Sequence, residues 1–164
     1  MKMKFKRYDT RKMFTFLSIF FWIGIVLYTF FVFEINGRVK KIDTSNLKIP
    51  SQGQIEYCIE NIRDDLDYIM ITGYAYEPGI SSSQILVKID LLICDESTKQ
   101  YYELPTENML RTDITESVND GCDYRYAGFK SVSAKKNLPD QYHIAILYER
   151  NGEKMLIDEG KNEK

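Results

Sequence analysis

The stretch that decides the fold is QILVKIDLLIC, residues 84–94. Its apolar side chains recur at every second position, at Ile85, Val87, Ile89, Leu91 and Ile93. Successive side chains of a strand point to opposite faces of a sheet, so this alternation predicts a strand with one face in a core.

The same period continues on the N-terminal side, where residues 67–76 alternate between Ile69, Ile71 and the tyrosines beside them. Glu77-Pro78-Gly79 follows, and proline then glycine suits the two central positions of a type II turn. Residues 142–148 alternate too, and Asn151-Gly152 after them is the preferred pair for a two-residue hairpin turn. The returning strand contains Met155 and Ile157 on one face.

Weaker strand patterns cover residues 55–62, 101–104 and 126–134. With the stronger ones they make about seven strands separated by short turns, without a long helical period. The expected fold class is therefore all-β, an antiparallel Ig-like β-sandwich over residues 55–158, with a small barrel as the second choice. Residues 159–164 form a polar tail.

A different pattern stands before this domain. Residues 14–33, FTFLSIFFWIGIVLYTFFVF, are twenty residues without an ionisable charge, the length that crosses a bilayer as one helix. A cleavable signal peptide is the alternative, but its apolar region is shorter and small residues precede its cleavage site. Phe31-Val32-Phe33-Glu34 offers no such site. We expect an uncleaved signal-anchor.

Charge sets the expected orientation. Residues 1–13 contain six basic side chains against Asp9, and three follow the span, Arg38, Lys40 and Lys41. The positive-inside rule predicts a cytoplasmic tail over 1–13 and an extracytoplasmic module at the cytoplasmic (inner) membrane.

Residues 34–54, which are polar with Gly37, Pro50 and Gly53, are predicted to form a juxtamembrane stalk. Residues 34–164 hold 23 acidic and 16 basic side chains, which disfavours nucleic acid as a partner.

Five segments, read together, resemble a small β-sandwich module of bacterial envelope proteins: YIMITGYAYEPG (68–79), ILVKIDLLI (85–93), RTDIT (111–115), YAGFKSVS (126–133) and LPDQYHIAIL (138–147). Asp140 departs from that pattern, which has glycine there. Modules of this kind occur attached to, or beside, membrane enzymes that build surface polysaccharides and teichoic-acid-like polymers. The resemblance implies a partner of that kind, a membrane glycosyltransferase or another envelope protein, and it implies no reaction.

Residues 111–133 carry the densest group of carboxylates, Asp113, Glu116, Asp120 and Asp123. A calcium loop with Gly121 at its sixth position would put Val118 at a ligand position, which valine cannot fill. We expect a loop rich in turn residues. Arg111 and Asp113 share a face if that segment is extended, and they form either an ion pair or a ligand contact.

Histidine and cysteine limit the chemistry further. His143 is the single histidine and lies inside a predicted strand, so a two-histidine metal site or an exposed triad histidine is not expected. Cys58, Cys94 and Cys122 lack CxxC spacing. The alternatives are one disulfide, Cys94–Cys122, or three reduced thiols. No metal and no cofactor are expected.

Tyrosine is the last distinctive feature, with ten residues after position 34. Tyr74 and Tyr76 share a strand face, and Tyr126 follows later; they pack at the strand rim or form a platform for sugar rings. Three functions follow from the sequence. The first is a non-catalytic accessory module in envelope polysaccharide assembly; the others are a glycan-binding domain and an envelope hydrolase with paired carboxylates.

Overall fold

The computed structural model describes residues 10–36, 39–82 and 86–158, and it divides the chain into two units, 1–36 and 37–164. The first unit is a single helix, α1 (Thr10–Asn36). Within it, the twenty residues Lys12–Phe31 have a mean hydropathy of 2.1 and no buried side chain. The helix is therefore long enough and apolar enough to cross a membrane.

The second unit is mostly β-structure, with nine strands in its described part. The strands are β1 (Lys40–Ile42), β2 (Glu56–Asp64), β3 (Tyr68–Tyr76), β4 (Val87–Asp95), β5 (Tyr101–Glu103), β6 (Thr106–Met109), β7 (Gly128–Ala134), β8 (Tyr142–Arg150) and β9 (Glu153–Ile157). A short helix, α2 (Thr112–Val118), and a 3-10 turn, η1 (Lys135–Asn137), complete it.

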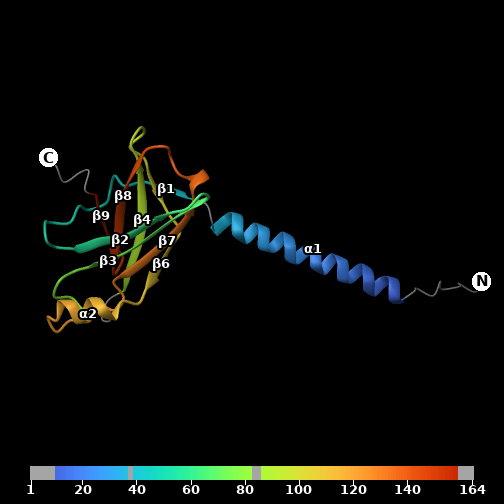
Figure 1. The fold of residues 1–164 in the computed structure, drawn as a ribbon, viewed down its shortest axis with the longest axis horizontal. Helices are drawn as coiled ribbons and strands as arrows, with labels where there is room; N and C mark the ends of the chain where they lie inside the picture. Colours follow the sequence, from blue (N-terminus) through green and yellow to red (C-terminus); the bar gives the residue numbers. More distant parts are fainter. Residues whose placement is uncertain (1–9, 37–38, 83–85, 159–164) are drawn as a thin grey trace, which may run out of the picture. The chain divides into compact units, whose positions relative to one another are not determined.

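These strands form two antiparallel sheets that pack over one core (Figure 1). The five-stranded sheet has the order β1-β5-β4-β8-β9, and the four-stranded sheet has the order β2-β3-β7-β6. The core joins Ile89, Leu91 and Ile93 of β4 to Ile71 of β3 and Phe129 of β7. The alternation of residues 84–94 is thus confirmed as the central inward face, although Gln84 and Ile85 lie outside the described residues.

The five-stranded sheet is buried on its outer face as well. Leu92, Ala145 and Leu156 form a second cluster there, which Leu47 covers. A sheet buried on both faces shows continuous apolar runs, and this explains why β4 reads LLIC rather than alternating strictly at its end.

Both predicted turns are confirmed. Gly79 has φ +77°, and the amide of Ile80 donates to the carbonyl of Glu77 at 3.2 Å, as a type II turn requires. Asn151 and Gly152 both have positive φ, +48° and +86°, and they join β8 to β9.

Two elements differ from the predictions. The segment after Arg111 is not extended, because Thr112–Val118 forms α2, with Asp113 in its first turn and Ile114 buried beneath it. The predicted loop is therefore wrong over Thr112–Val118, where Ile114 packs against the domain and Asp113 lies in the first turn of the helix. Thr106–Met109 also pairs with β7 as β6.

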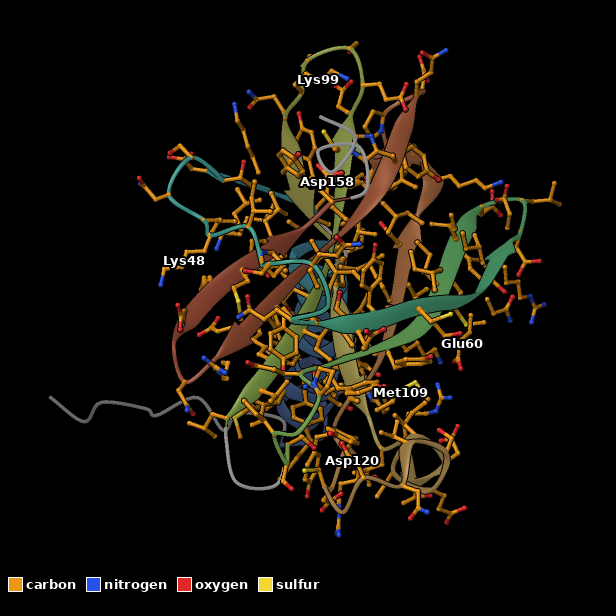
Figure 2. The ribbon with its side chains drawn as sticks, turned by 90° about the vertical axis from the view of Figure 1, so that its left-hand side faces the viewer. Lys48, Glu60, Lys99, Met109, Asp120 and Asp158 are labelled. Carbon is orange, nitrogen blue, oxygen red and sulfur yellow. The ribbon has the colours of Figure 1, made fainter. Side chains whose placement is uncertain are left out.

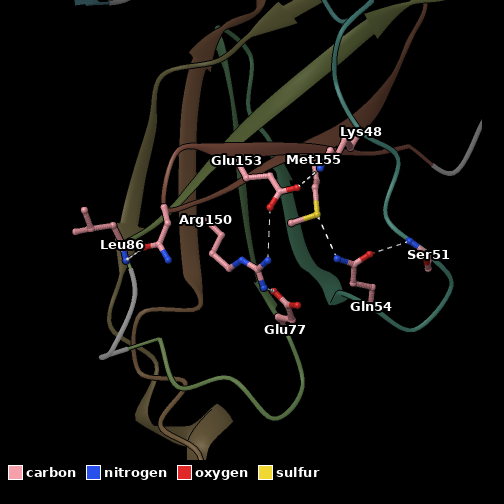
Figure 3. Close-up of polar contacts among 9 residues, drawn as sticks. Lys48, Ser51, Gln54, Glu77, Leu86, Arg150, Glu153 and Met155 are labelled. Carbon is pink, nitrogen blue, oxygen red and sulfur yellow. Dashed lines mark hydrogen bonds and ion pairs between the residues drawn. The ribbon is translucent and has the colours of Figure 1, made fainter.

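The expected stalk is also wrong in part, because much of residues 39–54 belongs to the domain. β1 pairs with β5, and Lys48 bridges to Met155 of β9. Side chains reinforce this contact: Lys48 pairs with Glu153 at 2.5 Å, and the Gln54 amide reaches the sulfur of Met155 at 3.5 Å (Figure 3). Polar composition suggested a spacer, but this segment covers the edge of β9.

Candidate functional site

The strongest polar cluster surrounds Arg111, on the outer face of the four-stranded sheet. Its guanidinium binds Glu60 through Nη1–Oε2 at 2.5 Å and Nη2–Oε1 at 2.8 Å. It binds Asp113 through Nε–Oδ1 at 2.8 Å and Nη2–Oδ2 at 2.7 Å. Its carbon Cζ lies 5.8 Å from the ring centroid of Tyr74. We call Glu60, Tyr74, Arg111 and Asp113 the Arg111 cluster.

The Arg111 cluster contains one positive side chain, Arg111, between two carboxylates, Glu60 and Asp113. Hydrogen bonds to Asp113 and Glu60 raise the pKa of Arg111, and the same guanidinium lowers the pKa of Asp113. The Arg111 side chain is only 18% exposed, and its guanidinium faces two carboxylates of this chain. The ion pair with Asp113 is present, and four of the five N–H donors of the guanidinium are in use.

The tyrosines predicted as a platform are packed by the chain itself. Tyr74 stacks on Tyr76 at 6.0 Å between ring centroids, and Tyr76 meets the buried Tyr124 at 4.5 Å. Tyr74 and Tyr76 also pack beside Ile114 of α2. Glu60, Met109 and Asp120 lie on the same side of the molecule as α2 (Figure 2). The structure thus joins Arg111, Asp113, Tyr74 and Tyr76, while Tyr126 stands outside this stack and is 44% exposed.

Three carboxylates of residues 111–133, Asp113, Asp120 and Asp123, bind groups of the same segment, while Glu116 is exposed. Asp120 accepts from the Tyr124 hydroxyl at 2.5 Å. Burial and then this hydrogen bond raise the pKa of Tyr124, and the same bond lowers the pKa of Asp120. Asp123 pairs with Arg125 at 2.7 Å. Tyr124 also accepts from the amide of Gly79, so this loop is tied to the turn after β3. No group of three metal-ligating side chains converges in the described part of the chain.

The three cysteines all lie among the described residues, and none forms a disulfide. Cys94 is buried with Leu92 on the outer face of the five-stranded sheet, whereas Cys122 packs near Tyr124 beside α2. The Cys94–Cys122 pair is therefore not made. The sequence predicts that Cys94 ends a strand and that Cys122 lies in a loop. It does not show that the two residues pack in different clusters, and a disulfide requires them to be neighbours.

A second polar group contains His143, on the outer face of the five-stranded sheet. Its Nε2 lies 3.0 Å from Oδ1 of Asp158, and its Nδ1 lies 3.8 Å from Oε1 of Glu96. Asp158 is 3% exposed and accepts from the Tyr101 hydroxyl. Burial and the Asp158 bond raise the pKa of Tyr101. The hydrogen bond from Tyr101 holds Asp158, the residue that follows β9, and His143 lies beside this pair.

A groove of about 610 Å³ opens between the two sheets. We call it the inter-sheet groove. It is lined by Tyr57, Ile59 and Ile62 of β2, Ile69 of β3, Tyr142, His143, Ile144, Ala145 and Ile146 of β8, Ile157 of β9, and Glu96. Ile62 is 49% exposed, while Ile69 and Ile157 form a floor that is 5% and 4% exposed. A groove of this size and apolar lining is typical of a binding site.

Sequence reasoning missed the groove, although its origin can be read from the hairpin. The Asn151–Gly152 turn fixes Arg150 opposite Glu153, and this register places Ile157 opposite Ile146. Within the described residues, the pairing with β9 therefore leaves out Tyr142–Ala145, the first four residues of β8.

No protein-family model, curated protein sequence or solved structure matches this chain.

Proposed function

We propose that this chain is a single-pass, membrane-anchored interaction module, non-catalytic, with its β-domain outside the cytoplasmic membrane. Its role would be that of an accessory protein in cell-envelope polysaccharide assembly, and the proposal includes the finer assignment of the fold as Ig-like. The inter-sheet groove carries the proposal, because it exposes isoleucine side chains that a closed sandwich would bury.

The polar clusters support a binding role rather than catalysis. Arg111, Asp113 and Asp120 are each engaged with side chains of the same chain. A hydrolase of the two-carboxylate type needs both groups to face one bond of the substrate. An acidic pair bound to a guanidinium and a tyrosine hydroxyl instead stabilises a loop.

Photo-crosslinking in native membranes tests the binding role. Benzoylphenylalanine replaces Ile62 in the full chain, and in a matched control it replaces Val132, which is 44% exposed on the outer face of the four-stranded sheet. We expect a discrete adduct with a membrane glycosyltransferase or another envelope protein from position 62 and none from position 132. Equal adducts from both positions, or none from position 62, would contradict the proposal.

Protease accessibility tests the orientation. In sealed right-side-out vesicles, external protease should cleave the loops of residues 39–158 and spare residues 1–13. Protection of the β-domain, with cleavage only after detergent is added, would place the groove in the cytoplasm and overturn the extracytoplasmic assignment.

A further inference from the structure

The turn that joins β8 to β9 is an Asn-Gly pair, Asn151–Gly152, and both residues are exposed. Asparagine followed by glycine is prone to spontaneous deamidation, because glycine has no side chain to hinder attack by its own amide nitrogen. The amide of Gly152 makes no hydrogen bond within the part of the chain that the structure describes. Its nitrogen is therefore available as the nucleophile of this reaction.

Deamidation at this turn needs no reactant other than water. The backbone nitrogen of Gly152 attacks Cγ of the Asn151 carboxamide. A bond forms between these two atoms, the bond from Cγ to Nδ2 breaks, and Nδ2 leaves as ammonia with the proton of the glycine amide. Water then opens the succinimide ring at one of its carbonyl carbons. One opening gives aspartate, and the other gives isoaspartate, in which Cβ becomes part of the main chain.

The closed turn opposes the attack. Asn151 has φ +48°, and its amide donates to the carbonyl of Leu86 at 3.0 Å. The amide of Leu86 in turn donates to Oδ1 of Asn151 at 3.1 Å (Figure 3). Ring closure turns the carboxamide and the following peptide bond toward each other, which the bond to Oδ1 and the pairing of Arg150 with Glu153 resist. The reaction therefore proceeds from the fraction of molecules in which the turn has opened.

The isoaspartyl product does not fit this hairpin. A two-residue turn sets the register of the whole β8–β9 ladder, which begins at Arg150 and Glu153. Isoaspartate adds a main-chain atom to the turn, whereas β9 holds its position through side chains that are buried on both of its faces, Met155, Leu156 and Ile157. Aspartate keeps the normal main chain, and Asp-Gly suits the same turn.

We propose that Asn151 is a site of spontaneous deamidation, that the closed turn slows the reaction, and that the isoaspartyl product releases β9 from β8. Ile157 of β9 also lines the inter-sheet groove, so the released state loses part of that lining. The inference does not depend on the proposed function, because it requires no partner.

Ageing of the full chain in lipid nanodiscs tests the site. Every chain carries Asn36→Gln, because Asn36–Gly37 is the other Asn-Gly pair of the sequence. The reference is a synthetic peptide of residues 148–155, since an isolated hairpin is not held closed. Mass spectrometry of digests follows conversion at mildly alkaline pH, where the glycine amide is more readily deprotonated. We expect Asn151 to convert about tenfold more slowly in the chain than in the peptide.

Hydrogen–deuterium exchange over residues 153–157 tests the release of β9. Anion exchange separates the aged products, which carry an additional negative charge. We expect the fraction that contains isoaspartate to exchange about tenfold faster than the fresh chain. Fresh Asn151→Asp is the matched control for charge. Aged Asn151→Gly is the control for other damage, because Gly-Gly suits the turn and cannot deamidate. Both controls should exchange as the unmodified chain does.

Three results would overturn the proposal. Equal or faster conversion in the chain than in the peptide would contradict protection by the closed turn. An unconverted Asn151 in the chain, after about a hundredfold the half-life in the peptide, would show that the turn is not a deamidation site. Unchanged exchange over 153–157 in the isoaspartate fraction, or equal acceleration in fresh Asn151→Asp, would contradict the release of β9 by isoaspartate.

Discussion

The Arg111 cluster and the inter-sheet groove lie on opposite faces of the four-stranded sheet, and they differ in how far the chain completes them. The Arg111 cluster is conspicuous in the sequence, and four hydrogen bonds to Glu60 and Asp113 engage its guanidinium. The groove consists of ordinary isoleucines, and Ile62 remains 49% exposed. The conspicuous charged residues are bound to one another, while inconspicuous aliphatic residues line the groove.

If the Arg111 cluster is close-packed, one added methyl group should damage it. A Cβ at Gly128 would stand 2.4 Å from Cγ of Arg111 and 2.7 Å from the carbonyl oxygen of Met109. We expect Gly128→Ala to lower the free energy of unfolding by about 2 kcal/mol, although alanine suits a strand better than glycine. Denaturant unfolding measures this. Lys130→Ala, on the same face of β7, is the control. Equal stability of the two variants would show that Arg111 and Met109 move aside to accommodate the methyl group.

Removal of the Arg111 guanidinium should lower the free energy of unfolding by less than Gly128→Ala does. Arg111→Met keeps an unbranched side chain but removes the guanidinium over Tyr74 and leaves Glu60 and Asp113 without their cation. Because both carboxylates are partly exposed and regain water, we expect a loss of about 1 kcal/mol in the free energy of unfolding. A double-mutant cycle with Glu60→Gln isolates the pair. A coupling energy of zero would mean that the cluster does not stabilise the domain.

The pKa of Asp113 reports the same contact without unfolding. The guanidinium lowers this pKa below its ordinary value of 3.8. A lowered pKa in the folded state means that the contribution to stability is complete above pH 3.8 and is lost as pH falls through the folded pKa. Carboxyl titration by NMR should show the midpoint of Asp113 rising in Arg111→Met. Asp95, whose pKa of about 2 comes from bonds to Ser97 and Thr98, should stay unchanged.

The contrast also explains what the sequence could predict. Strand alternation and two turn motifs depend on neighbours along the chain, and they correctly located most strands, including β4 and the β8–β9 hairpin. Helix α2 and strand β6 depend on the sheet beneath them, since Ile114 alone gives no helical period. The pairing of Arg111 with Glu60 spans fifty-one residues, which local patterns cannot reveal.

Part of the groove could in principle be predicted from the register of the β8–β9 hairpin. A two-residue turn at Asn151–Gly152 determines every pair of the hairpin, including Ile157 opposite Ile146. The sequence does not determine that Asp158 binds Tyr101, which holds that side chain on the outer face. The groove therefore follows from strand pairing, and residue types associated with chemistry do not mark it.

The smallest effect on stability is expected in the groove. Ile62→Thr keeps a β-branched side chain on β2 and removes apolar surface from a side chain that is already half exposed. We expect the free energy of unfolding to change by no more than about 0.5 kcal/mol. Thermal unfolding measures this change. A large loss of stability would mean that Ile62 completes the core, and the groove would then resemble the Arg111 cluster rather than oppose it.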